Sequence, residues 1–195
     1  MIKVVIFDAG NVVCKSWLDT ARKYFSKKLG ISREEFEHAF HACDHDSAVG
    51  KEPIEEFVRK LSGKIGREID FNEFIKFVLD VQLNKNVVNL AKGLGKKYTV
   101  AMLSDDCEPN TSKLRNAVKD AFHEFYFSNE LGMRKPDKRI FRTVINKLYT
   151  KPDECLFIDD KSENVKAAKS VGMHAVQFVS YEKLLKDLKN HGVIL

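Results

Sequence analysis

Five short apolar segments, separated by stretches with helical periodicity, most constrain the folds open to this chain. The segments are VVIF at 4–7, YTVAML at 98–103, EFYF at 124–127, CLFI at 155–158 and HAVQFV at 174–179. Strands that are buried on both faces are apolar at nearly every position, as in parallel sheets covered by helices. The stretches between them place apolar residues at helical spacing over residues 86–97, 111–122, 138–149 and 163–172. This alternation predicts a doubly wound α/β fold with a parallel sheet.

Residues 15–85 interrupt the alternation of strands and helices. They contain four amphipathic helical patterns and no convincing strand. Two of the patterns begin with the signature of a capping box, Ser32 followed by Glu35 and Asp70 followed by Glu73. We therefore predict an α/β core domain formed by residues 1–14 and 86–195, with a helical domain of residues 15–85 inserted after the first strand.

Charge and cysteine content narrow the class of protein. The chain has 33 Lys and Arg against 28 Asp and Glu, and the excess is spread over several segments. We interpret it as solvated helix faces rather than a nucleic-acid surface, although a mildly positive field also suits a phosphorylated small molecule. The four cysteines form no C-x-x-C pair and no disulfide framework, which predicts reduced thiols and a cytoplasmic location. No signal-like segment and no apolar run of about 18 residues occurs, so we expect neither secretion nor a membrane span.

Reactive side chains follow four of the predicted strands. In strand order they are Asp8; Ser104, Asp105 and Asp106; Lys135; and Asp159 and Asp160. The carboxyl ends of parallel strands meet at one edge of a sheet, where these groups would converge. Converging carboxylates raise one another's pKa unless cations neutralise them, and Mg²⁺ (magnesium) and Lys135 are the natural candidates. Ser104 and backbone N–H groups would supply donors for a phosphate. The residues thus predict a site that holds a carboxylate, Mg²⁺ and a phosphoryl group together.

Four segments, FDAGNVV, AMLSDD, GMRKP and FIDDKSENVKAA, occur in this order along the chain. In these segments, and over essentially its whole length, the chain resembles the haloacid dehalogenase superfamily of phosphohydrolases. The branch with a D-x-G-N-V first motif includes sugar-phosphate phosphatases. Residues 15–85 stand at the position of the family's helical cap. The resemblance implies a monomeric or homodimeric Mg²⁺-dependent phosphatase whose cap selects a small phosphorylated metabolite, with a sugar phosphate as the first candidate.

The resemblance also implies a role for each motif residue. Asp8 would be the nucleophile that forms an aspartyl phosphate, and Lys135 would offset its charge and that of the phosphate. The implied metal ligands are Asp8, Asp160 and the carbonyl of Gly10, with Asp159 as a direct or indirect ligand. The implied phosphate-binding residues are Ser104, Asp105, Lys135 and Asn11, and Asn164 would hold the last of the four loops in place.

One residue departs from the family pattern. Gly10 stands where most members have a second Asp that protonates the leaving alcohol and then activates water. Such acid–base help is typically worth about 10²–10⁴-fold, so the resemblance leaves open a slow enzyme or a binding or regulatory protein without turnover. Haloacid dehalogenases also lack the second Asp, but they do not need a metal and lack the acidic pair, here Asp159 and Asp160. A phosphomutase is disfavoured, because it depends most on the missing acid.

Two further groups leave alternatives open. Asp105 stands where the family more often has Asn, so one hypothesis is that Asp105 or Asp106 partly takes over proton transfer. The alternative, which we favour from the sequence, is a loop carboxylate turned to solvent or capping the next helix. His38, His41 and His45 share one helix face, and we expect a helix end that faces the cleft rather than a second metal site.

Overall fold

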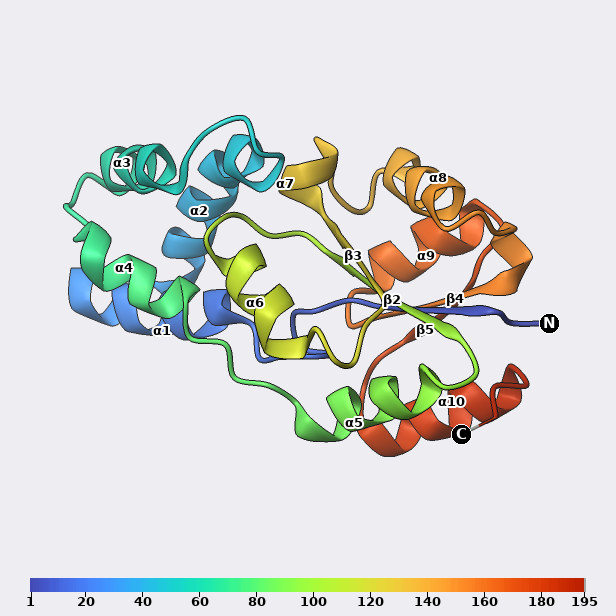
Figure 1. Cartoon of the computed structure of the whole chain (residues 1–195). Coiled ribbons are helices and arrows are strands. Elements are labelled where there is room, and N and C mark those ends of the chain that lie inside the picture. Colours follow the sequence, from blue (N-terminus) through green and yellow to red (C-terminus); the bar gives the residue numbers. More distant parts are fainter. Residues whose placement is uncertain (195) are drawn as a thin grey trace.

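The computed structural model describes residues 1–194, which form a parallel sheet flanked by helices and, beside it, a group of four helices (Figure 1). The strands are β1 (Val4–Phe7), β2 (Thr99–Ser104), β3 (Glu124–Phe127), β4 (Cys155–Asp159) and β5 (His174–Gln177). They are parallel and lie in the order β3-β2-β1-β4-β5. The predicted doubly wound α/β fold is therefore confirmed.

Several predicted element boundaries were wrong, and two of them illustrate the reason. The last strand ends at Gln177 rather than at residue 179, because its neighbour β4 ends at Asp159, the residue paired with Gln177. The predicted helix 138–149 ends at Lys147, and Tyr149 beyond it adopts a left-handed conformation with φ of 50°. The last residue of the predicted core domain, Leu195, lies outside the described residues.

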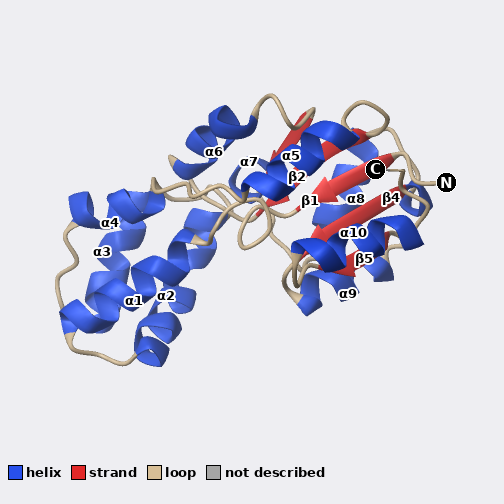
Figure 2. Cartoon of the chain, turned by 90° about the horizontal axis from the view of Figure 1, so that it is seen from below, coloured by secondary structure: helices blue, strands red, loops and turns tan. Residues whose placement is uncertain are grey.

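Helices cover both faces of the sheet (Figure 2). One face carries α5 (Lys85–Leu94), α6 (Asn110–Val118) and α10 (Tyr181–Asn190), and the other carries α8 (Lys138–Lys147) and α9 (Ser162–Ser170). Two short helices, α7 (Ser128–Leu131) and a 3-10 turn (Pro152–Glu154), lie in the connections. Alternate residues of β1 enter the two cores, so every residue of this strand is buried and apolar. This double burial is the physical reason that the strands are apolar at nearly every position.

The remaining helices are α1 (Trp17–Leu29), α2 (Arg33–Ala48), α3 (Ile54–Ile65) and α4 (Phe71–Val78), and we call them the cap. Two of them begin at the predicted caps. The side chain of Ser32 accepts a hydrogen bond from the backbone N–H of Glu35 at 3.0 Å, and that of Asp70 accepts one from Glu73 at 2.7 Å. These bonds satisfy N–H groups that have no partner within the helix and so fix where α2 and α4 start.

The cap has its own aromatic interior, separate from the two cores on the sheet. Phe25, Phe36 and Phe74 are each at most 1% exposed, and the ring centroids of Phe25 and Phe74 lie 5.6 Å apart. These phenylalanines therefore form the core of the cap. Two chain segments join the cap to the sheet, and they run side by side through an antiparallel bridge between Cys14 and Leu83.

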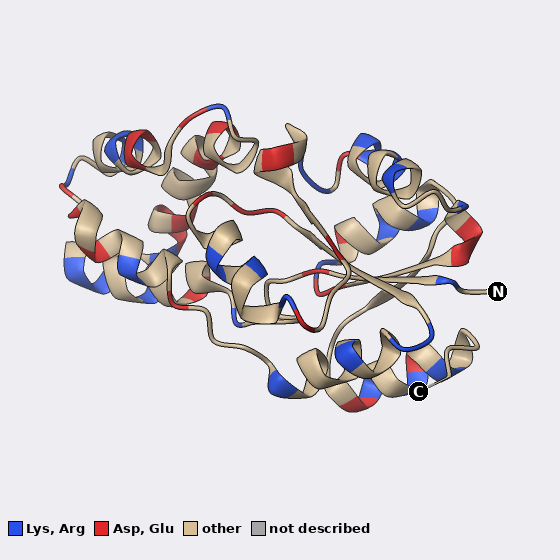
Figure 3. Ribbon diagram, in the orientation of Figure 1, with Lys and Arg blue, Asp and Glu red and all other residues tan. Residues whose placement is uncertain are grey.

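Positions of Lys and Arg are spread over helices of both the core and the cap (Figure 3). This distribution fits the interpretation of the positive charge as solvated helix faces. Among residues 1–194, no helix combines the length and the apolar character that crossing a bilayer requires.

Candidate active site

The carboxyl ends of β1, β2 and β4 bring the predicted reactive residues to one pocket. Asp8 follows β1, Ser104 ends β2 and Asp159 ends β4, while Lys135 reaches in from the loop after α7. All four side chains belong to buried residues, and Asp8, Ser104 and Lys135 line the pocket. Asp105 and Asp160 are half-buried and line it as well. Because parallel strands all end at the same sheet edge, one topology collects residues from distant parts of the chain.

Lys135 holds the two buried carboxylates together. Its Nζ donates hydrogen bonds to Oδ1 of Asp8 at 2.5 Å, to Oδ2 of Asp159 at 3.0 Å and to the carbonyl oxygen of Leu103 at 3.0 Å. An ammonium group has three hydrogens to donate, so its donor capacity is fully used. Lys135 is 4% exposed, which leaves these acceptors as its main compensation for lost hydration.

Electrostatics at this cluster favour an added cation. Burial raises the pKa of Asp8 to about 7, with Lys135 opposing the rise and Asp159 adding to it. Burial alone would lower the pKa of Lys135, but the charges of Asp8 and Asp159 outweigh it and raise that pKa. One ammonium group therefore faces more negative charge than it can neutralise.

The structure also brings together a set of possible metal ligands. Asp8, Asp159 and Asp160 each offer a carboxylate oxygen, and these atoms lie within 4.8 Å of one another. Both oxygens of Asp159 already accept hydrogen bonds, Oδ1 from Lys161 N and Asn164 Nδ2, and Oδ2 from Lys135 Nζ and Asn164 Nδ2. The carboxylates of Asp8 and Asp160 accept fewer hydrogen bonds than that of Asp159, so the geometry favours these two residues as direct metal ligands. Asp159 instead holds Lys135 and the loop that follows β4.

Asn11 and Gly10 lie at the turn after β1. Asn11 accepts a hydrogen bond from Ser16 N at 3.1 Å through Oδ1 and donates one to Oδ2 of Asp160 at 3.2 Å through Nδ2. In this structure the predicted phosphate ligand Asn11 thus positions Asp160. A Cβ built on Gly10 would meet no atom within 4 Å, so the backbone would accommodate a side chain at that position.

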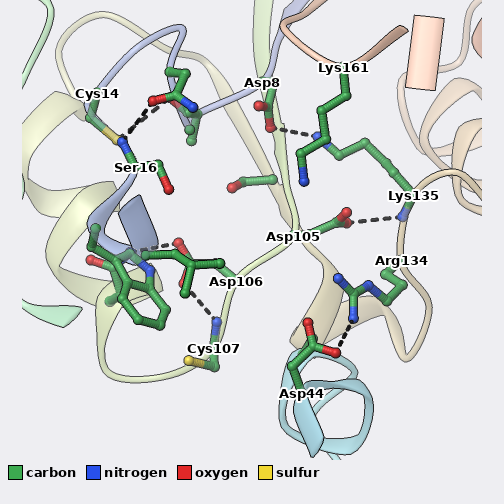
Figure 4. Close-up of a pocket in the computed structure, with 18 of the residues that line it drawn as sticks. Asp8, Cys14, Ser16, Asp44, Asp105, Asp106, Cys107, Arg134, Lys135 and Lys161 are labelled. Atoms are coloured by element: carbon green, nitrogen blue, oxygen red, sulfur yellow. Dashed lines mark hydrogen bonds and ion pairs between the residues drawn. The ribbon is translucent and has the colours of Figure 1, made fainter. Parts of the chain in front are cut away.

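The carboxylates of Asp105 and Asp106 point to opposite sides of the pocket (Figure 4). Oδ1 of Asp105 accepts a hydrogen bond from the backbone N–H of Lys135 at 3.0 Å. Asp106 accepts from Cys107 N at 2.9 Å and from Asn110 Nδ2 at 2.6 Å, in the turn that leads into α6. Burial raises the pKa of Asp106 to about 6. The interpretation of a carboxylate turned to solvent was therefore wrong for both residues. Asp106 holds the turn before α6 but does not cap the helix, which has no side-chain capping bond.

The cap supplies the opposite wall of the pocket, including Trp17 from α1, Phe40, His41 and Asp44 from α2, and Phe57 from α3. Trp17 lines the pocket and also packs against Phe40, with ring centroids 6.0 Å apart. Of the three predicted cap histidines, only His41 is among the lining residues. Its Nδ1 lies 3.4 Å from Oδ2 of Asp44. Within the described chain, the one group of carboxylates, histidines and cysteines able to hold a metal is that of Asp8, Asp159 and Asp160.

An ion pair between cap and core was not predicted from the sequence. Arg134 Nη1 lies 3.1 Å from Oδ1 of Asp44 and joins the loop that carries Lys135 to helix α2 (Figure 4). The only sequence signal was the place of Arg134 beside Lys135 in the third motif. Its partner comes from the cap, about 90 residues earlier in the chain, and nothing in the local pattern around Asp44 indicates the contact.

Comparison with known proteins places these features in a family. Residues 2–172 match the haloacid dehalogenase-like hydrolases. The chain is 30% identical over 192 residues to D-ribitol-5-phosphate phosphatase of Bacteroides thetaiotaomicron, covering 91% of this chain and 92% of that protein.

Solved structures agree at the level of the fold. A magnesium complex of a family enzyme from Bacteroides thetaiotaomicron has a TM-score of 0.80 at 23% identity, over 95% of this chain and 98% of that one. L-2-haloacid dehalogenase of Xanthobacter autotrophicus has a TM-score of 0.70 at 18% identity, over 100% and 85% of the two chains. Since the family match, the relative of similar length and the shared fold all agree, the chain belongs to the haloacid dehalogenase-like hydrolases.

Proposed function

We propose that this protein is a Mg²⁺-dependent phosphatase that hydrolyses a small phosphorylated metabolite, with a sugar or sugar-alcohol phosphate as the first candidate. The observation that carries the proposal is the buried carboxylate of Asp8, held by Lys135 at the base of a pocket beside Asp160. A carboxylate held by a cation next to a possible metal site is arranged to attack an anionic phosphorus centre, which needs charge neutralisation.

The donor set fits magnesium. Asp8 and Asp160 would hold the ion together with the carbonyl of Gly10, and hard oxygen ligands of this kind are what Mg²⁺ prefers. The bound ion would neutralise phosphate oxygens and orient the phosphoryl group for attack. We also propose that the cap domain extends from residue 15 to residue 85.

Asp8 would attack phosphorus in line with the leaving oxygen and form an aspartyl phosphate, which water then hydrolyses. Lys135 occupies Oδ1 of Asp8, so Oδ2 is the atom left for attack. Ser104, at the end of β2, and the backbone around Asp105 would donate to the phosphoryl oxygens. The cap would close over the substrate and exclude bulk water from the reaction.

The relatives support a phosphatase over the alternatives. The 30% identical relative is described as a D-ribitol-5-phosphate phosphatase, and a structure of the Bacteroides family enzyme is described as a complex with magnesium and inorganic phosphate. The acidic pair of Asp159 and Asp160 argues against the dehalogenase chemistry of the more distant structural neighbours. The four cysteines are free, and free thiols persist in a reducing compartment such as the cytoplasm, which we propose as the location of this protein.

The test is phosphate release from a panel of esters that includes sugar phosphates, sugar-alcohol phosphates and 4-nitrophenyl phosphate, with and without Mg²⁺. We expect release that requires the metal and falls at least about 10³-fold in Asp8→Asn, because the nucleophile is lost. Asp120→Asn, at an exposed position, is the matched control and should keep full activity. A folded protein that binds Mg²⁺ but hydrolyses no ester would favour the binding or regulatory alternative. Metal-independent halide release from 2-haloacids would favour a dehalogenase.

A further inference from the structure

Hydrolysis of an alkyl phosphate needs a proton for the leaving alcohol, and Gly10 cannot supply one. Two carboxyl groups in the loop after β2, those of Asp105 and Asp106, line the pocket beside Ser104. We propose that Asp105 is the catalytic acid and base of this protein. The inference rests on the proposed phosphatase function and adds a residue to it.

The contacts of Asp105 hold its carboxylate in the pocket that contains Asp8. It directly follows Ser104 and lines the same pocket as Asp8. Lys135 contacts both carboxylates, donating its backbone N–H to Asp105 at 3.0 Å and its Nζ to Asp8 at 2.5 Å. The bond to Lys135 fixes Oδ1 of Asp105, whereas Oδ2 has no hydrogen-bond partner within residues 1–194. One oxygen is thus anchored and the other is left for a substrate.

The environment of Asp105 also suits a proton donor. Burial raises the pKa of its carboxyl, against the opposing charges of Lys135, Arg134 and Lys161. A carboxyl group that keeps its proton closer to neutral pH than an ordinary Asp is a better general acid. The charge of Asp105 in turn contributes to the raised pKa of Asp8, so the two groups act on each other across the pocket.

Asp106 does not qualify, although it lines the pocket and its pKa is also raised. Its Oδ1 accepts from Cys107 N and its Oδ2 from Asn110 Nδ2. Both oxygens are therefore used to hold the turn before α6. Figure 4 shows this carboxylate directed toward Cys107, away from Lys135.

The proposed proton transfers balance over the two steps. As an oxygen of Asp8 bonds to phosphorus, the bond from phosphorus to the leaving oxygen breaks, and protonated Asp105 gives its proton to that oxygen to form the alcohol. The Asp105 carboxylate then takes a proton from water as the water oxygen bonds to phosphorus. The bond from phosphorus to Asp8 breaks, which releases phosphate and the Asp8 carboxylate and leaves Asp105 protonated.

The dependence of rate on the leaving group tests this role. 4-Nitrophenolate leaves without a proton, whereas a sugar-alcohol alkoxide does not. We expect Asp105→Asn to lose about 10²–10³-fold in kcat/KM, which reports only the steps up to release of the alcohol, on a sugar-alcohol phosphate and less than about 10-fold on 4-nitrophenyl phosphate. The Asn carbonyl oxygen can still accept the bond from Lys135, so the loop should keep its geometry. The matched control, Asp106→Asn, should change both rates by the same factor, because its role is structural.

A second variant separates chemistry from structure. Since a Cβ on Gly10 meets no atom within 4 Å, Asp can be introduced there. The double variant Gly10→Asp with Asp105→Asn should recover at least about 10-fold of the lost alkyl-ester turnover, because the acid returns at another position. If Asp105→Asn does not fold, Asp105→Ser, which also lacks the carboxyl group, carries the same expectation. Recovery would support the proposal, since a lost structural contact would not be restored from position 10.

Two outcomes overturn the inference, and they are distinguishable. If the wild type hydrolyses esters but Asp105→Asn lowers kcat/KM for the two esters equally or not at all, Asp105 is not the acid, and the phosphatase function stands. If the wild type hydrolyses no ester, the phosphatase function fails and the inference fails with it.

Discussion

The active-site cluster of the core and the interior of the cap both consist of buried residues, yet they bury opposite kinds of side chain. At the sheet edge the buried side chains are Asp8, Lys135 and Asp159, of which Asp8 is the most exposed at 7%. In the cap they are aromatic rings such as Phe25, Phe36 and Phe74. An apolar interior needs only suitable volume and shape, whereas a buried charge also needs a specific partner. The cap can therefore vary its residues far more freely than the site can.

Two substitutions test this difference, one that removes a charge at nearly constant volume and one that changes volume without a change of polarity. Lys135→Met keeps most of the side-chain volume but leaves Asp8 and Asp159 without their cation. We expect it to cost about 3–5 kcal/mol of unfolding free energy in metal-free buffer and to abolish turnover. Phe36→Leu in the cap replaces one apolar side chain by another and should cost about 1–1.5 kcal/mol. Urea denaturation of both variants measures the difference, and equal costs would contradict it.

Binding of magnesium should stabilise the core site and not the interior of the cap, so the stability gained with the metal is a second test of this difference. At 100 times its dissociation constant, a ligand of the folded state adds about 2.7 kcal/mol of stability. The effect should depend on pH because burial raises the pKa of Asp8 to about 7. Unfolded Asp8 loses its proton near pH 4, whereas the folded group keeps it to about pH 7. The stability of the metal-free protein should therefore decrease as the pH rises from about 4 to about 7.

We therefore expect the gain in melting temperature caused by Mg²⁺ to increase from pH 5.5 to pH 7.5. Differential scanning fluorimetry with and without the metal, at matched ionic strength, measures this gain. Asp160→Asn should reduce it, and Asp120→Asn, outside the site, should leave it unchanged. A gain that is the same at both pH values would argue against a linkage between Asp8 and the metal.

The smallest expected effect concerns the contact between the two regions. Asp44→Asn weakens the ion pair of Asp44 with Arg134, whose side chains are 12% and 27% exposed. A partly exposed pair is worth about 1 kcal/mol or less, so stability should hardly change. We expect KM to rise about 3- to 10-fold with kcat nearly constant, because the cap would close less often over the substrate. Asp46→Asn, on the same helix but outside the pocket lining, is the control, and equal effects of the two variants would dismiss this role for the pair.

Much of the core could be predicted from short patterns. The apolar strands predicted a parallel sheet, and the side chains that follow them identified Asp8, Ser104, Lys135 and Asp159 before the structure was known. The prediction succeeded because strand ends in such a sheet share one edge, so strand order hardly matters to where these residues meet. The caps at Ser32 and Asp70 were equally local, since a capping hydrogen bond spans three residues.

The orientation of side chains could not be predicted in the same way. Asp105 and Asp106 are neighbours in sequence, but one binds the loop of Lys135 and the other the turn before α6. Asn11 lies in the first motif, yet in this structure it bonds to Asp160, from the far end of the chain. Each of these contacts depends on which loop lies opposite, and sequence spacing carries no information about that.

By itself, the sequence determined the doubly wound fold and the chemical types gathered at the sheet edge, because these follow from periodicity and from motifs within single segments. Only the tertiary structure decided that Lys135 bridges Asp8 and Asp159, that Arg134 meets Asp44 across the cleft, and which acid beside Ser104 has a free oxygen. The physical reason is that hydrogen bonds and ion pairs act over about 3 Å, so they form only after folding has brought distant segments into register.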